Sequence, residues 1–175
     1  AVQKAFKDKA RNTYTPFFSP IAIATFEPVV QVLAKNGVAH ENQGIWEIDM
    51  AKYLELVKDK KRWSDLKGNK AYKPQRNVLI TSTDIRKSNS AVMYMTLASY
   101  VMNNNSVVTD KGAAEAQVDD LAKLFLNQGY AQGSSAAPFE RYLSRGMGEA
   151  PMVIAYEGQF LGEETAQNSR IRDNM

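Results

Sequence analysis

Short apolar runs, separated by longer amphipathic stretches, limit how this chain can fold more than any other feature. The runs lie at residues 20–25, 77–82 and 151–156, and their shortness and β-branched content are typical of buried strands. Apolar residues at helical spacing lie between them. Alternation of strands and helices indicates the α/β class, so we expect a three-layer fold in which a mostly parallel central sheet carries helices on both faces.

The helices are predicted from their apolar spacing and their end signals. The first should begin at Glu27 and Pro28 and stop at Asn36 and Gly37, because glycine often terminates helices. The polar stretch 37–44, which contains His40, is predicted to be a solvated loop. Further helices are predicted at residues 91–102, 112–128, 139–143 and 48–60, the last with Asp49 as a candidate cap.

The residue types that most enzymes use are scarce in this chain. It has no Cys and one His, which excludes thiol nucleophiles, CxxC redox sites and HExxH metalloproteases. A catalytic triad would need His40, and no GxSxG elbow is present. We therefore expect a protein that is not an enzyme and that has no catalytic residues, no metal ligands and no cofactor.

The charge distribution gives no sign of a nucleic-acid partner. The chain has 22 Lys and Arg residues against 19 Asp and Glu, with the basic excess at residues 4–11 and 58–62. Neither run is interleaved with aromatic residues, and no helix-turn-helix pattern accompanies them. We expect no nucleic-acid binding.

A polar segment follows the second apolar run and carries the candidate site. Residues 81–90 are rich in hydroxyl and amide side chains and lead directly into the predicted helix at 91–102. Open α/β sheets bind ligands at such strand-to-helix loops, where the free N–H groups of the helix start attract polar groups. Ser88, Asn89 and Ser90 are also favoured caps, so they either contact a ligand or only cap the helix.

Two similar segments bracket the body of the chain. Residues 20–27 and 151–157 each contain a proline, an apolar run, an aromatic residue and a glutamate. We interpret them as paired points at which the chain enters and leaves one α/β body, with a hinge between that body and another.

The order of several segments resembles the bacterial type II extracellular solute-binding proteins, the binding subunits of ABC transporters. These segments are SPIAIA (19–24), WSDL (63–66), VLITSTD (78–84), SNS (88–90) and PMVIAYE (151–157). In that family crossing strands join two α/β lobes, the ligand lies between the lobes, and the second lobe is inserted between the crossings. The resemblance implies a second lobe at residues 19–160, a lead-in from a first lobe at 1–18, and a polar tail at 161–175 that returns toward that lobe.

The resemblance also implies a function and a set of site residues. The protein would bind a small solute by hydrogen bonding and hinge closure and deliver it to an ABC transporter permease, with the first lobe of the same polypeptide as its partner. It would be extracellular, anchored at the cell surface or periplasmic, and would meet the membrane only through a lipid anchor missing from this chain. The implied ligand-binding residues are Ser82, Thr83, Asp84, Ser88, Asn89 and Ser90, with Thr25, Tyr156 and Glu157 at the crossings.

The ligand class and the function class each have alternatives. Asp84 favours a cationic or hydroxyl-bearing ligand, whereas Arg86, Lys87 and the helix start favour an anion. An effector-sensing domain of a transcription regulator would use the same kind of lobe, but it requires a DNA-binding helix-turn-helix. A nucleotide-dependent α/β enzyme would need GxGxxG or GxxxxGK[ST], and the chain has neither.

Overall fold

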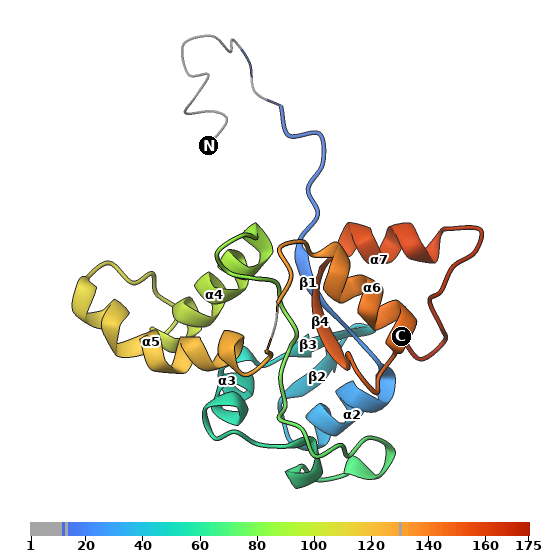
Figure 1. Cartoon of the computed structure of the whole chain (residues 1–175), viewed down its shortest axis with the longest axis horizontal. Coiled ribbons are helices and arrows are strands. Elements are labelled where there is room, and N and C mark those ends of the chain that lie inside the picture. Colours follow the sequence, from blue (N-terminus) through green and yellow to red (C-terminus); the bar gives the residue numbers. More distant parts are fainter. Residues whose placement is uncertain (1–11, 13, 130) are drawn as a thin grey trace.

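The computed structural model describes residues 12, 14–129 and 131–175, so the basic run at 4–11 lies outside the described residues. This part of the chain is mixed α/β (Figure 1). Its strands are β1 (Ile21–Thr25), β2 (Ala39–Asn42), β3 (Ile45–Ile48) and β4 (Met152–Tyr156). Its helices are α2 (Glu27–Lys35), α3 (Met50–Lys58), α4 (Asn89–Met102), α5 (Lys111–Leu126), α6 (Ala136–Arg145) and α7 (Glu157–Glu164), with short 3-10 turns at Trp63–Asp65 and Asn69–Ala71.

Both sheets of the described chain are antiparallel pairs. β1 pairs with β4, so that Ile21 lies opposite Tyr156 and Thr25 lies opposite Met152. β2 pairs with β3 in a separate sheet. The mixture of helices and strands agrees with the predicted α/β class, but the predicted three-layer fold around a mostly parallel central sheet is wrong, because the described strands form two small antiparallel sheets.

The predicted strand at 77–82 is an extended segment that does not form a continuous ladder. Asn77 makes an antiparallel bridge with Arg62, whereas Thr81 makes a parallel bridge with Val153 in β4. The second bridge consists of hydrogen bonds from Thr81 N–H to the Met152 carbonyl and from Ile154 N–H to the Thr81 carbonyl, both 2.8 Å. Because the segment changes partner between these two points, parallel pairing with β4 is limited to one position.

The stretch at 37–44 contains strand β2 rather than the loop that we predicted. Gln43 and Gly44 have φ values of 52° and 82° and form the two-residue turn of the β2–β3 hairpin. His40 lies within β2, and its Nε2 is 3.2 Å from Glu47 Oε2 across the hairpin. Since β3 extends to Ile48, the next helix begins later than predicted, at Met50.

Local end signals were predicted more successfully. Asp49 caps α3, because its Oδ1 accepts a hydrogen bond of 3.1 Å from Lys52 N–H. α2 begins at Glu27 and is followed by Asn36 as its C-cap, as the proline and glycine signals indicated. The strands at 20–25 and 151–156 are confirmed as β1 and β4.

The hydrophobic core lies between the β1–β4 sheet and the helices around it. Its largest fully buried side chains include Trp63, Tyr53, Tyr94 and Tyr142. α4 turns Ala91, Tyr94 and Ala98 toward this core. Its other apolar face stays exposed, with Met93, Leu97 and Tyr100 among the large hydrophobic side chains at the surface.

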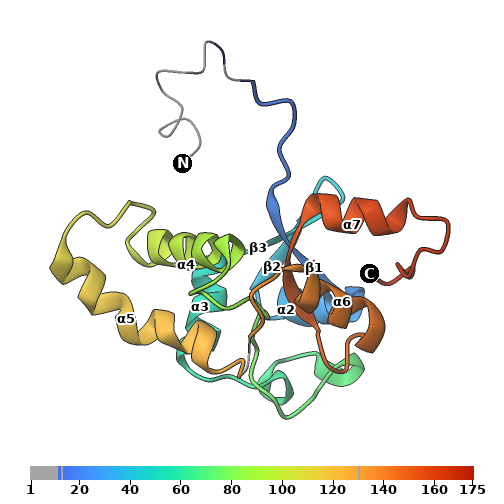
Figure 2. The same ribbon diagram turned by 45° about the horizontal axis from the view of Figure 1, so that its top comes forward.

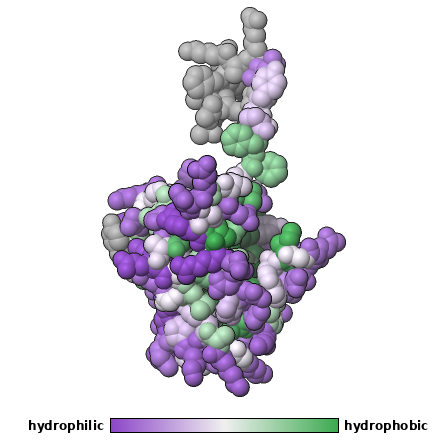
Figure 3. Space-filling model, turned by 90° about the vertical axis from the view of Figure 1, so that its right-hand side faces the viewer, coloured by the Kyte–Doolittle hydropathy of each residue, from purple (hydrophilic) through white to green (hydrophobic). Residues whose placement is uncertain are grey.

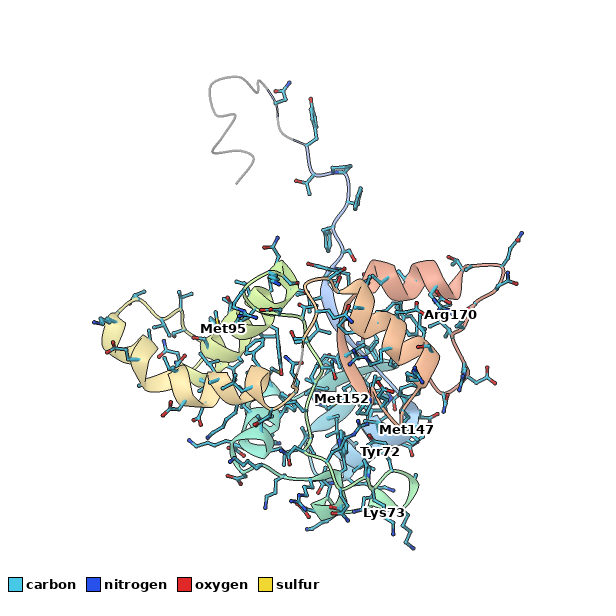
Figure 4. All side chains as sticks on the ribbon, in the orientation of Figure 1. Tyr72, Lys73, Met95, Met147, Met152 and Arg170 are labelled. Atoms are coloured by element: carbon cyan, nitrogen blue, oxygen red, sulfur yellow. The ribbon has the colours of Figure 1, made fainter. Side chains whose placement is uncertain are left out.

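The two ends of the described chain behave differently. Residues 14–20, which we call the neck, rise from the start of β1 and carry hydrophobic surface away from the body (Figures 1 and 3). The C-terminal residues instead turn back onto the body, where Glu27 N–H donates to the Asn174 carbonyl at 2.7 Å. Arg170, labelled in Figure 4, donates to Glu163 in α7 and to Glu140 in α6. The described tail therefore contacts α2, α6 and α7 of the body, and its predicted return toward a first lobe stays a prediction.

Candidate functional site

Residues 82–90, which we call the site loop, are carried to one end of the β1–β4 sheet. Thr81 is bridged in parallel to β4, so the chain beyond it continues in the direction of β4. It thereby reaches the end where β4 finishes at Tyr156 and β1 begins at Ile21, which we call the upper end. Figures 1 and 2 show α4 starting beside this end.

Three hydroxyl groups of the site loop form a hydrogen-bonded chain. Thr83 Oγ1 lies 3.0 Å from Ser90 Oγ, which lies 2.8 Å from Ser88 Oγ. Thr83 and Ser90 are buried, whereas Ser88 is partly exposed. The buried pair therefore has a structural role, and Ser88 is the member of the chain that solvent reaches.

The start of α4 is not capped by a serine. Ser88 occupies the N-cap position, but its side chain makes no capping hydrogen bond. The interpretation that Ser88 serves only as a helix cap is therefore wrong. Asn89 follows it at the first helical position and its side chain is exposed. An uncapped helix start leaves backbone N–H groups for solvent or for a ligand.

Asp84 is engaged by its own loop. Its carboxylate accepts hydrogen bonds from Arg86 N–H and Nε, both 3.0 Å, and from Arg86 Nη2 at 2.7 Å. These bonds from Arg86 lower the pKa of Asp84 to about 2. Asp84 and Arg86 thus neutralise each other, and neither sets the charge of the site loop alone.

The crossing residues are divided between the two ends of the sheet. Tyr156 and Glu157 lie at the upper end, where Glu157 N–H donates to the Pro20 carbonyl at 3.0 Å. Thr25 lies at the other end of β1, and its Oγ1 donates to the Pro151 carbonyl at 2.9 Å. The structure therefore separates Thr25 from the other predicted site residues.

Gln128 is a residue of this region that we did not predict. Its Oε1 accepts a hydrogen bond of 2.7 Å from Ser82 N–H. Ser82 Oγ and Gln128 Nε2 are both buried, and neither has a partner among the described residues. A cavity of about 440 Å³ lies between Gln128, two residues after the end of α5, and Thr83, Asp84 and Arg86. In the sequence, Gln128 is distinguished only by its place in the polar pair Asn127–Gln128 before Gly129. Such pairs are common at helix ends, so this signal does not single the residue out.

No family model, curated protein or solved structure matches this chain. Within the described ranges, no cluster of three or more His, Asp or Glu side chains could hold a metal ion. In the same part of the chain, no helix has the length and apolar character needed to cross a membrane.

Proposed function

We propose that this chain is a ligand-binding lobe of a two-lobed solute-binding protein. That protein would act outside the cytoplasm and deliver a small solute to an ABC importer. One observation carries the proposal. The start of β1, the end of β4 and the site loop lie at the same end of the body, and the neck leaves the body there (Figure 1). A second lobe attached through the neck would face the site loop, and a solute would be held between the two.

The chemistry of the site loop supports this role. Ser88 and Asn89 offer a hydroxyl and an amide beside an uncapped helix start. The N-terminus of a helix favours groups that accept hydrogen bonds or carry negative charge. Because Asp84 is neutralised by Arg86, its carboxylate does not oppose such a ligand. We infer a solute that presents hydroxyl, carbonyl or carboxylate oxygens to α4.

The neck supports a partner at this end. Phe17 and Phe18 are 81% and 85% exposed, and Tyr14 is 79% exposed. Clustered exposed aromatic side chains are typical of surfaces that another body covers. The first lobe of the same polypeptide would cover them when the two lobes close.

The second crossing departs from the family pattern. After Tyr156 the chain forms α7, which packs on β1 and β4 of the same body. The neck is a connection through which this lobe would be joined to the first, and the hinge is proposed to lie at residues 14–20.

The test is a binding measurement on the full-length polypeptide. A thermal-shift screen of sugars, amino acids and small organic acids identifies a solute, and calorimetry then compares Asn89→Ala with the matched control Asn168→Ala. Both side chains are exposed, but Asn168 lies in the tail. Loss of the Asn89 contact should weaken binding by about 1–3 kcal/mol with an unchanged melting temperature, because a ligand oxygen loses its donor. Equal affinity of the two variants would contradict the assignment of the site loop.

A further inference from the structure

A second cavity lies beside the start of β4 and shares Gln128 with the cavity at the site loop. Its volume is about 390 Å³, which falls within the range of small-molecule sites. Its charged and amide lining includes Arg62, Arg76, Arg141, Asn127, Gln128 and Glu149. We propose that this cavity, the arginine cavity, binds a small polyanion that carries two or more phosphate or carboxylate groups.

The charges around the arginine cavity are unbalanced. Three arginines line it against a single glutamate. Glu149 is also shared, because its carboxylate lies 3.6 Å from Arg141 Nε and 3.9 Å from Arg145 Nε. Arg62 makes no ion pair with any described residue. Guanidinium groups gathered around one cavity repel one another until an anion lies between them.

Arg76 is held rigidly but its charge is not paired. Nη1 donates to the Glu149 carbonyl at 2.8 Å, and Nη2 donates to the Gly148 carbonyl at 2.7 Å and to Tyr72 Oη at 2.8 Å. Nη2 also lies 3.2 Å from the Met147 carbonyl, and Figure 4 shows Tyr72 and Met147 close together. All these acceptors are neutral. Arg76 Nε is buried and has no acceptor in the described part of the chain.

Gln128 adds a second buried donor beside the same cavity. Its side-chain oxygen, Oε1, accepts a hydrogen bond from Ser82 N–H. The side-chain nitrogen, Nε2, is the donor at the other end of the same amide group. Nε2 is buried without a partner among the described residues. Buried donors are costly when unpaired, so a ligand or water normally supplies the missing acceptor. Phosphate and carboxylate oxygens accept hydrogen bonds and also neutralise the arginines, which a neutral ligand would not do.

The test uses inorganic pyrophosphate and citrate as separate probes in calorimetry with the whole chain. The variants are Arg62→Gln and Gln128→Glu, and the control is Arg172→Gln, which removes the same charge from an exposed position in the tail. Gln128→Glu keeps the oxygen that accepts from Ser82 N–H but replaces the amide donor by a negative charge. Arg62 is exposed, so its variant should fold normally even if Gln128→Glu does not.

We expect one equivalent of at least one probe to bind, with affinity reduced about tenfold or more in both cavity variants and less than about twofold in Arg172→Gln. Tighter binding of pyrophosphate would identify a phosphate ligand, and tighter binding of citrate would identify a carboxylate ligand. Either result supports the arginine cavity. Failure of both probes to bind would overturn the proposal, as would an equal loss in Arg62→Gln and Arg172→Gln, because that pattern is general attraction to a basic protein.

Discussion

The hydroxyl oxygens of Tyr53 and Tyr94 lie 3.0 Å apart in the core and join α3 to α4. Tyr53 Oη also accepts a hydrogen bond of 2.9 Å from Ile80 N–H. Both side chains are fully buried. This small network therefore connects two helices to the extended segment that leads into the site loop, and it positions the start of α4 relative to that segment.

The two tyrosines should differ in their importance for stability. Tyr53→Phe leaves Ile80 N–H and the Tyr94 hydroxyl without partners, whereas Tyr94→Phe removes only the bond between the tyrosines. Because each unsatisfied buried group costs free energy, we expect a loss of about 2–4 kcal/mol for Tyr53→Phe and about 1 kcal/mol for Tyr94→Phe. Urea unfolding followed by circular dichroism measures both. Equal losses would show that the Ile80 bond contributes nothing.

The protein should become less stable at high pH because the buried Tyr53 side chain loses its proton. Burial raises the pKa of Tyr53 from 10.0 to about 12. The unfolded chain therefore loses this proton first, so the contribution of Tyr53 is fully present below pH 10 and is lost as pH rises toward 12. The free energy of unfolding should fall more steeply across this interval in the natural protein than in Tyr53→Phe. The exposed-site variant Tyr14→Phe serves as the control and should follow the natural protein.

Protonation of Asp84 should make the protein less stable at low pH. Hydrogen bonds from Arg86 lower its pKa from 3.8 to about 2, so its contribution is present above pH 3.8 and is lost as pH falls toward 2. The melting temperature of the natural protein should decrease in this interval, and Asp84→Asn should show a shallower decrease. Asp173→Asn, an exposed change in the tail, is the matched control. Parallel curves for the natural protein and Asp84→Asn would contradict the loop pairing.

The β2–β3 turn requires glycine for its backbone conformation alone. Gly44 has φ of 82° and nothing lies within 4 Å of the position that a Cβ would occupy. Gly44→Ala should therefore destabilise the protein by about 1–2 kcal/mol through backbone strain. Gly162→Ala in α7 also meets no neighbour, and it should stabilise the helix by up to about 1 kcal/mol. In thermal unfolding, we expect the melting temperature to fall in Gly44→Ala and to rise in Gly162→Ala.

Several features that depend only on residues close together in the sequence were predicted correctly. Pro28 and Gly37 bounded α2, and Asp49 capped α3, because these effects act within one turn of helix. The β2–β3 hairpin is also local, and its two-residue turn at Gln43 and Gly44 was a signal that we did not use. Strand direction was not local. An apolar strand has the same pattern whether its partner runs parallel or antiparallel, so the pairing of β1 with β4 could not be predicted from either strand.

The sequence by itself determined that hydroxyl and amide side chains gather at residues 82–90, directly before a helix. Only the tertiary structure decided which of them remain available. Packing buried Thr83 against Ser90, the turn at Asp84 let Arg86 neutralise it, and strand pairing carried Thr25 to the far end of the sheet. The tertiary structure also brought Gln128 into hydrogen-bond contact with Ser82, which lies 46 positions earlier in the chain. Hydrogen-bond partners that lie far apart along a chain are chosen by the packing of whole elements, and that choice is not visible in any short segment.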